Sequence, residues 1–341
     1  MRRWSRFAVM ALLTLAPNWS GPAHRPVLGR YAHIKATPVA FDPENPARRR
    51  AGALTFLGGM ELTSDDPAFG GFSSLMVGQG KFTLLSDGGN IAIFHLRPGL
   101  RVKHAIFRDL PGGPGTGWYK SDRDSESMTA DLATGQIWVG FEHSNAIGRF
   151  ARGFETAEDG GSPPPMRDWS DNGGAESLVR LRDGRFLTIA ETDRRWGSNA
   201  RNAILFAGDP VAQPDRWVRF GYVPPDGFDP SDAAELPDGR LVVLNRRLDF
   251  PFVWSAVLTV IDPAQIKPGV ILRGVEIARL APPLSVDNFE GVAVTREGAA
   301  TILWLVSDDN LFVLQRTLLF KFRLDLPETP PARSPKGERA G

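Results

Sequence analysis

One segment pattern occurs five times in this chain, and it limits the possible folds more than any other feature. Each copy begins with a short strand-like segment, passes through a turn and continues into a run rich in β-branched and aromatic residues. Turns such as Asp183-Gly184 and Asp238-Gly239 are typical of β-hairpins. The copies are FSSLMVGQGKFTLLSDGG from Phe72, SESMTADLATGQIWVGFEHS from Ser125, AESLVRLRDGRFLTIAETD from Ala175, SDAAELPDGRLVVLNRR from Ser231 and FEGVAVTREGAATILWLVSDD from Phe289.

The spacing of the copies predicts the architecture. They follow one another at intervals of about fifty to sixty residues, which is the size of one four-stranded propeller blade. Segments such as AILFAG and LLFKFRL supply the later strands, and the body has no sustained helical periodicity. Closing the sheets into a ring protects their edge strands. The sequence therefore predicts an all-β protein with a β-propeller over residues 53–326, and a pair of β-sandwiches is the alternative.

The number of blades is less constrained than the fold. Two further segments, 54–62 and 270–280, read as additional strands beyond the five copies. We therefore expect six blades, with the sixth closed by strands from both ends of the chain. Five or seven blades remain alternatives.

The two ends of the chain differ from its body. Arg2, Arg3 and Arg6 precede a short apolar run, which is typical of an export signal over residues 1–23, and a buried first helix is the alternative. Residues 24–52 read as an extended lead-in, and the Pro-rich residues 327–341 as a disordered tail. We therefore expect a periplasmic or secreted protein without a membrane span after signal cleavage.

Composition and missing motifs exclude several classes of function. The chain has no cysteine, which rules out disulfides, thiolate metal sites and a cysteine nucleophile. Its formal net charge is +1, so no nucleic-acid partner is expected, because such partners require a basic surplus. The sequence contains no G-x-S-x-G elbow, H-E-x-x-H motif, Walker A motif or EF-hand loop.

Acidic residues recur at matching places in the copies. In a propeller the first strand of each blade lines the central channel, so the leading positions are expected to form a ring of Ser73, Glu126, Glu176, Asp232 and Glu290. The ends of the second strands add Asp87, Glu142, Glu191, Asn245 and Asp308. Carboxylates this close must be protonated or share a cation, and oxygen ligands of this kind suit Ca²⁺.

We therefore predict a divalent cation, Ca²⁺, bound by Glu126, Glu176, Asp232 and Glu290. The alternative is structural. Acidic residues at the starts of blades can accept hydrogen bonds from neighbouring backbone N–H groups and so tie the blades together.

Two arginine pairs follow second strands, Arg194-Arg195 and Arg246-Arg247. Guanidinium groups bind carboxylate and phosphate in a bidentate fashion, so these residues are predicted to hold a small anionic or ester substrate. Ion pairs with Asp193 and Asp249 on a wet surface are the alternative.

One histidine stands at a place where it could take part in chemistry. His143 directly follows Glu142, and we predict that one of these two residues is the general base. A structural role is the alternative for this lone histidine.

Taken in order, four stretches resemble the phytase-like propeller family, which is often labelled as having esterase-like activity. They are FSSLMV…FTLLSDGG, SDRDSESMTAD…IWVGFEHSNAIGRF, NGGAESLVRLRDGRFLTIAETD and DNFEGVAV…LWLVSDDN followed by LLFKFRLD. The resemblance covers roughly residues 55 to 325 and implies a propeller fold, export in bacteria and hydrolase activity. The chain is similar to true β-propeller phytases more in architecture than in site motifs.

These observations predict a metal-dependent hydrolase of phosphate or carboxylic esters. A non-catalytic propeller that binds a ligand or a protein, and a lactonase-like propeller with one bound divalent ion, are the alternatives.

Overall fold

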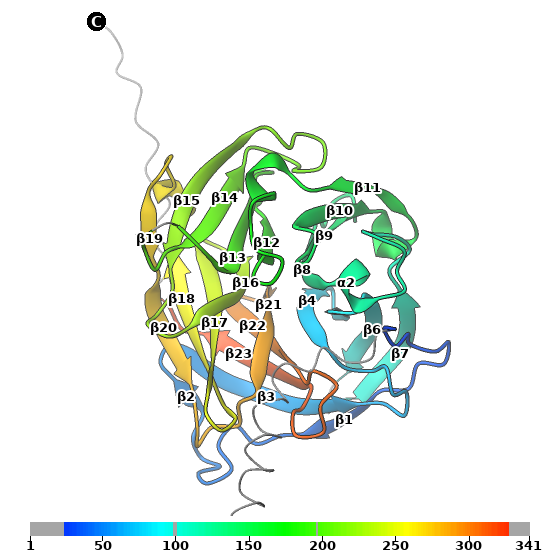
Figure 1. Cartoon of the computed structure of the whole chain (residues 1–341). Coiled ribbons are helices and arrows are strands. Elements are labelled where there is room, and N and C mark those ends of the chain that lie inside the picture. The colour runs from blue at the N-terminus through cyan, green and yellow to red at the C-terminus, as the bar shows by residue number, and fades with distance from the viewer. Residues whose placement is uncertain (1–23, 98–100, 196, 327–341) are drawn as a thin grey trace, which may run out of the picture.

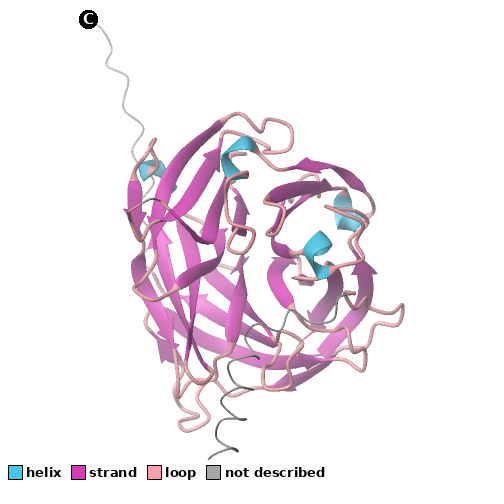
Figure 2. Cartoon of the chain, viewed as in Figure 1, coloured by secondary structure: helices cyan, strands magenta, loops and turns pink. Residues whose placement is uncertain are grey.

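The computed structural model describes residues 24–97, 101–195 and 197–326. The expected signal, residues 1–23, and the expected tail, residues 327–341, lie outside the described residues. Nearly all the regular secondary structure of the described residues is β-strand, arranged as sheets around a central axis (Figure 1; Figure 2). The expectation of an all-β propeller is confirmed.

The first three blades follow one another along the chain, each built outward from an inner strand. Blade I contains β4 (Phe72–Gly78), β5 (Lys81–Ser86), β6 (Asn90–Arg97) and β7 (Arg101–Asp109). Blade II contains β8 (Ser125–Ala130), β9 (Ile137–Phe141), β10 (Ala146–Phe150) and β11 (Ala157–Gly161). Blade III contains β12 (Ala175–Arg180), β13 (Phe186–Arg194), β14 (Arg201–Phe206), β15 (Trp217–Val223) and the short parallel strand β19 (Ile271–Arg273).

The last two blades complete the ring. Blade IV contains β16 (Asp229–Glu235), β17 (Leu241–Asp249), β18 (Val253–Ile261) and β20 (Val275–Leu280). Blade V contains β21 (Asn288–Glu297), β22 (Ala300–Asp308) and β23 (Leu318–Leu324), together with β3 (Leu54–Thr63) from the start of the chain. Two short strands of the lead-in, β1 (Lys35–Pro38) and β2 (Arg50–Ala51), pair with β3.

Within residues 24–97, 101–195 and 197–326, helices are short and lie between strands. They are α2 (Lys120–Arg123) and the 3₁₀ segments η2 (Arg152–Phe154), η3 (Pro164–Met166) and η4 (Pro263–Gln265). No helix in the described ranges has the length and apolar character needed to cross a membrane.

The propeller has five blades, one of the alternatives, rather than the expected six. Both segments that suggested a sixth blade are outer strands of other blades. Segment 54–62 lies in β3, which pairs with β23, and segment 270–280 divides into β19 and β20, which join blades III and IV. Because strand β3 from the start of the chain completes a blade made from its end, the ring is closed by backbone hydrogen bonds.

The inner strands and the core confirm that this ring is continuous. Strands β4, β8, β12, β16 and β21 each contact the inner strands of both neighbouring blades. Five buried apolar clusters fill the five interfaces between adjacent blades. In the interface of blades IV and V, Phe56 and Phe320 pack with their ring centroids 5.4 Å apart. Each such buried aromatic side chain contributes roughly 1.5–3 kcal/mol to folding.

Candidate functional site

Every inner strand contains a β-bulge close to its first residue. In each blade the pairing with the second strand skips one residue, and the skipped residues are Ser73, Glu126, Glu176, Ser231 and Glu290. A bulge redirects the side chain of the extra residue. Three of the four predicted metal ligands, Glu126, Glu176 and Glu290, therefore occupy equivalent positions on the ring.

Asp232 does not share this position, so its predicted place in the ring is corrected. The bulged residue of blade IV is Ser231, and Asp232 pairs with Leu244 in the regular register. Its buried carboxylate accepts hydrogen bonds from the N–H groups of Ala233 and Val292, each at 2.8 Å. The bond to Val292 ties blade IV to blade V, which is the structural alternative considered for the acidic residues.

The sequence carried a signal for the correct alignment. The Asp-Gly turns provide it, because Glu176 stands seven residues before Asp183 and Ser231 stands seven residues before Asp238. Aligning these copies on the turn, rather than on the acidic residue, places Ser231 with Glu176.

A second ring lies one residue beyond the pair that immediately precedes each bulge, in the direction of the second strand. Those pairs are Phe72–Ser86, Ser125–Phe141, Ala175–Ala190, Pro230–Asn245 and Phe289–Ser307. The next residues are Asp87, Glu142, Glu191, Arg246 and Asp308. Blade IV thus presents a guanidinium where the other four blades present a carboxylate.

Asn245, which was expected in that second ring, lies one position earlier. Its side chain is buried, and its Oδ1 accepts a hydrogen bond of 2.8 Å from the hydroxyl of Tyr222. Its amide nitrogen donates to the backbone oxygen of Val257 at 3.0 Å. Asn245 therefore has a structural role at the interface of blades III and IV.

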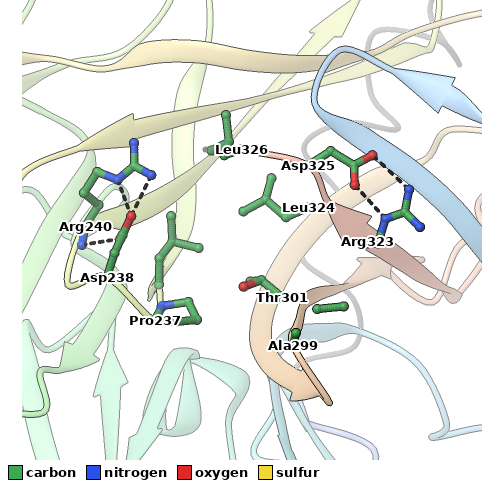
Figure 3. A pocket seen from close by; sticks show the side chains of 11 residues that line it. Pro237, Asp238, Arg240, Ala299, Thr301, Arg323, Leu324, Asp325 and Leu326 are labelled. Atoms are coloured by element: carbon green, nitrogen blue, oxygen red, sulfur yellow. Dashed lines mark hydrogen bonds and ion pairs between the residues drawn. The ribbon is translucent and has the colours of Figure 1, made fainter. Parts of the chain in front are cut away.

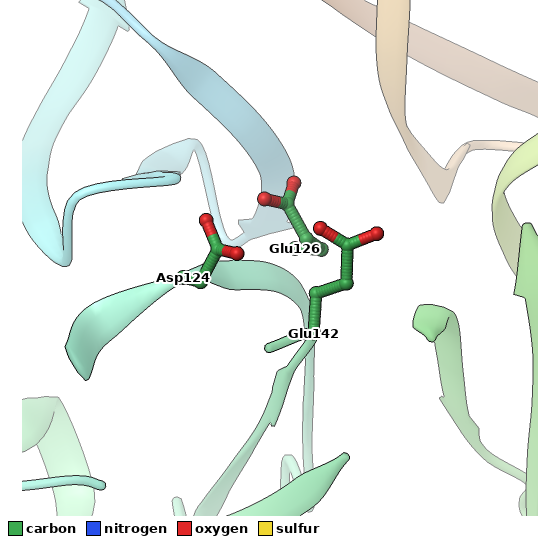
Figure 4. A group of neighbouring side chains, drawn as sticks. All are labelled: Asp124, Glu126 and Glu142. Carbon is green, nitrogen blue, oxygen red and sulfur yellow. The ribbon is translucent and has the colours of Figure 1, made fainter. Parts of the chain in front are cut away.

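Five carboxylates converge at the junction of blades II and III. Asp124, Glu126 and Glu142 form one group in which the candidate ligand atoms all lie within 4.8 Å of one another (Figure 4). Glu142, Glu176 and Glu191 form a second group by the same measure. Glu142 belongs to both, and one of its oxygens also accepts a hydrogen bond from the N–H of Gly173.

Two cationic groups face these carboxylates from opposite sides. The ammonium of Lys120, in α2, lies 2.9 Å from Asp87 and 3.3 Å from Asp124. The guanidinium of Arg246 lies 2.8 Å from Glu191 and 3.4 Å from Glu290. Burial disfavours both cations, but the surrounding carboxylates outweigh it and raise the pKa of Lys120 and of Arg246.

Burial and mutual repulsion both raise the pKa values of the clustered carboxyl groups. Desolvation, followed by the charges of neighbouring carboxylates, raises the pKa of Glu126 and of Glu176 well above the usual range. The same causes raise the pKa of Glu142 to about 7. Without a further cation, part of this cluster is therefore protonated at neutral pH.

Glu290 lies beside the cluster but outside both groups of ligand atoms. It accepts a hydrogen bond of 2.6 Å from the side chain of Asn288, and the charge of Glu290 helps to raise the pKa of Glu126. His143 is exposed in the turn between β9 and β10, and its charge acts on Asp124 in the direction that lowers the pKa of that carboxyl.

The four predicted arginines are divided between two places. Arg246 and Arg247 line a large cleft, which Glu191 and Glu290 also line. Arg247 also pairs with Asp249 at 2.7 Å, as the surface alternative expected. Arg195 instead donates to the backbone oxygen of Gly269 at 2.9 Å, next to β19 at the outer side of blade III, and Arg194 is exposed on β13.

The cleft has a volume of about 930 Å³ and is lined by blades I, IV and V, the end of β13 and the lead-in. Asp87, Lys120, Glu191, Arg246 and Glu290 lie among its polar lining residues. Arg25 also lines it, held by a bidentate pair with Asp109 at 2.7 and 2.6 Å.

Three residues near the carboxylates escaped the sequence-based prediction. Asp124 directly precedes the second copy, so a slightly wider repeat would have included it. Lys120 and Arg25 lie outside the repeated segments, and no pattern in the sequence pointed to them.

A smaller cavity of about 400 Å³ lies between blades IV and V at the turns that follow the inner strands (Figure 3). Its charged residues are already paired: Arg240 with Asp238 and Arg323 with Asp325, each at 2.6 Å. Its charges are paired and it contains no group of converging carboxylates. We therefore place the candidate site at the carboxylate cluster and the larger cleft, which adjoins the cluster at Glu191.

A family model described as "Phytase-like: Esterase-like activity of phytase" matches residues 67–311, well over half of the chain. The matched range runs from just before β4 to just after β22 and includes all the carboxylates of the cluster. No curated protein matches.

Solved structures that match the chain are distant. One, from Bacteroides fragilis, is described as an exported protein; it is 12% identical, covers 80% of this chain and 94% of its own, and has a TM-score of 0.39. Another is an α-L-arabinofuranosidase from Podospora anserina in complex with cellotriose; it is 11% identical, covers 87% of this chain and 98% of its own, and has a TM-score of 0.44. Similarity at this level carries no argument about activity.

Proposed function

Since this chain belongs to the phytase-like family of β-propellers, we propose that it is a metal-dependent hydrolase of phosphate or carboxylic esters. The observation that carries the proposal is the convergence of Asp124, Glu126, Glu142, Glu176 and Glu191 on one side of the channel. Lys120 and Arg246 alone leave much of that negative charge uncompensated.

The residues fit a hard divalent cation. Ca²⁺ binds oxygen ligands at about 2.3–2.6 Å, so two oxygens on one ion lie within about 5 Å of each other. The ligand atoms of each group meet that limit, at 4.8 Å or less. We therefore assign cation binding to these five carboxylates, with Ca²⁺ as the proposed ion, and place Glu290 beside them as the partner of Arg246.

A bound divalent cation supplies Lewis acidity toward the ester or phosphoryl oxygen of a substrate. The side chains supply the remaining functions. Glu142 lies in both groups, so we assign it to cation binding. This leaves His143, exposed directly after Glu142, as the proposed general base, since imidazole is the side chain that most often acts in this role. Arg246 and Arg247 are proposed to hold the anionic part of the substrate in the cleft.

The decisive experiment measures metal content and turnover in the same preparations. Purified protein is analysed for bound metal, then assayed on a panel of aryl phosphates and aryl carboxylates before and after EDTA. We expect chelation to abolish turnover and Ca²⁺ to restore it. Activity that persists after complete metal removal would disprove the metal mechanism, and a metal-free, inactive protein would favour the non-catalytic binding alternative.

Two variants separate the roles of the neighbouring residues. Glu142→Gln is expected to lose both metal and activity, whereas His143→Gln is expected to keep its metal and lose activity. Glu158→Gln is the matched control, because Glu158 lies on the outer strand β11 and pairs with Arg149 at 3.0 Å. If His143→Gln remains fully active, Glu142 becomes the candidate base.

We also propose that the protein is exported, on the basis of the charged and apolar pattern of residues 1–23. N-terminal sequencing of the protein recovered from a bacterial periplasm or medium tests this. A mature chain that still begins at Met1 would contradict it.

A further inference from the structure

The cleft that adjoins the carboxylate cluster at Glu191 has two chemically different walls. Its polar side is formed by acidic and basic groups such as Asp87, Lys120 and Glu191. Its other side comes from two loop regions, the tip of the β17–β18 hairpin and the segment between β22 and β23. Six apolar residues of these regions line the cleft: Leu248, Phe252, Trp254, Leu311, Phe312 and Val313.

The two loop regions form one continuous apolar wall. The rings of Phe252 and Phe312 lie 6.4 Å apart between centroids, so the loops meet. Val313 is 90% exposed and Leu311 is 46% exposed. Apolar side chains held at the mouth of a cleft and open to solvent commonly mark a ligand-binding surface.

Among the residues that line the cleft, the large apolar side chains come from blades IV and V. The corresponding loops of the first two blades contain Asp87-Gly88-Gly89 and Glu142-His143-Ser144-Asn145, which are polar or glycine-rich. In the third blade, the described residues between β13 and β14 are Arg195 and Gly197-Ser198-Asn199-Ala200, which are polar or small. Repeated blades can carry any loop at these places. Because the apolar side chains of the cleft come from blades IV and V, we expect a ligand that turns its apolar part toward these two blades.

The apolar wall adjoins the charged floor directly. The guanidinium of Arg246 lies 5.8 Å from the ring centroid of Trp254 and 2.8 Å from Glu191. A ligand that reaches both surfaces must therefore combine a polar group with a hydrocarbon group.

We propose that the substrate of this cleft is an ester with a hydrocarbon group of several carbons, which packs on the wall formed by the two loops while the ester lies beside Glu191, at the edge of the carboxylate cluster. This proposal rests on the proposed ester hydrolase function and names its substrate class. A cleft of about 930 Å³ has the size of sites that enclose whole small-molecule ligands.

The first test measures turnover of p-nitrophenyl esters from acetate to octanoate. Each methylene that leaves water on the apolar wall is expected to raise kcat/KM by about two- to fourfold. Val313→Ser and Phe252→Ala are expected to flatten this dependence on chain length. Val313 is mostly exposed, so its replacement leaves the fold intact.

Two exposed residues in the same loop regions serve as matched controls. Leu314 is 72% exposed and Phe250 is 78% exposed, and neither lines the cleft. Leu314→Ser and Phe250→Ser are expected to keep the wild-type dependence on chain length. If the controls flatten it as much as Val313→Ser does, the wall is not the specific contact and the proposal is wrong.

A second test does not require turnover. Binding of methyl octyl ketone and of acetone, which are neutral and not hydrolysed, is compared by saturation-transfer NMR. Preferential binding of the longer ketone that is lost in Val313→Ser supports the apolar wall even if no ester is hydrolysed, in which case the proposed function alone fails. Equal, weak binding of both ketones together with a flat ester profile overturns the inference.

The same loops could instead face a lipid surface, and vesicles distinguish this case. The substrate proposal would be overturned by two results together. The protein would co-sediment with phosphatidylcholine vesicles and lose this binding in both Phe250→Ser and Leu314→Ser, and its turnover would not depend on ester chain length. Absence of vesicle binding, with the chain-length dependence present, supports it.

Discussion

The guanidinium of Arg246 lies 2.8 Å from the carboxylate of Glu191, and the two residues occupy equivalent positions in adjacent blades. One ring position therefore carries an acidic residue in four blades and a basic residue in the fifth. This substitution places a fixed positive charge next to a cluster that is proposed to bind a cation. It compensates Glu191 and Glu290 within the protein, whereas Asp124 is compensated by Lys120 at 3.3 Å.

Removing this charge should destabilise the protein in a pH-dependent way. Arg246→Gln leaves buried carboxylates without their partner, which typically costs about 3 kcal/mol or more in the free energy of unfolding. The loss should shrink as the pH falls, because Glu290, whose pKa is raised by burial, takes up a proton. Urea denaturation at several pH values checks this. Arg247→Gln is the control, because Arg247 and Asp249 are 37% and 48% exposed and such a pair contributes less than about 1 kcal/mol.

The metal-free protein should lose stability as the pH rises toward neutral. Glu142 has a pKa raised from 4.5 to about 7, so the folded state binds more protons than the unfolded state in that interval. Its contribution is fully present below pH 4.5 and is lost as the pH rises through about 7, amounting to roughly 3 kcal/mol at most. Unfolding measured in EDTA between pH 4 and 8 tests this.

Calcium and one variant provide the controls for that pH dependence. Added Ca²⁺ should stabilise the protein far more at pH 8 than at pH 5, because binding requires ionised carboxylates. Glu142→Gln should flatten the metal-free profile. A profile that is already flat in the parent protein would contradict the raised pKa of Glu142.

Asp232 should prove structural and not a metal ligand. Asp232→Ala removes the acceptor for the N–H groups of Ala233 and Val292, and an unsatisfied buried donor costs about 1–3 kcal/mol. Its metal content should equal that of the parent protein, whereas Glu176→Gln should bind less metal. Calorimetric unfolding and metal analysis of both variants check this, and loss of metal in Asp232→Ala would contradict the assignment.

Two neighbouring glycines of β3 should respond differently to the same substitution. A Cβ at Gly59 would lie 2.7 Å from the ring of Phe320, whereas a Cβ at Gly58 would have no atom within 4 Å. Gly59→Ala should therefore weaken the closure between β3 and β23 by about 1–3 kcal/mol. Gly58→Ala should be neutral within about half a kcal/mol. Comparable unfolding midpoints for the two variants would show that the closure does not depend on this packing.

The repeat explains why the fold was predictable and the blade count was not. Hairpin turns such as Asp183-Gly184 and Asp238-Gly239 are local signals, and their spacing follows from the size of one blade. Which sheet an outer strand joins depends on contacts between distant parts of the chain. The pairing of β3 with β23, and of β19 with β15, has no local signature in either segment.

The site was predicted in part for the same reason. Glu126, Glu176 and Glu290 share a repeated position, so the sequence alone indicated that they lie together. A shift of one residue misplaced Asp232 and Asn245, because an acidic residue beside the true position imitated the pattern. Lys120 and Arg25 reach the cleft from segments that do not repeat.

The amino-acid sequence by itself determined the propeller class and the ring of acidic side chains, because both depend on strand periodicity and on local turn chemistry that recur along the chain. The tertiary structure decided how the ring closes, which carboxylates meet, and where positive charge faces them. Those features depend on distances between residues far apart in the chain, and a difference of one residue in register changes which side chain faces the channel.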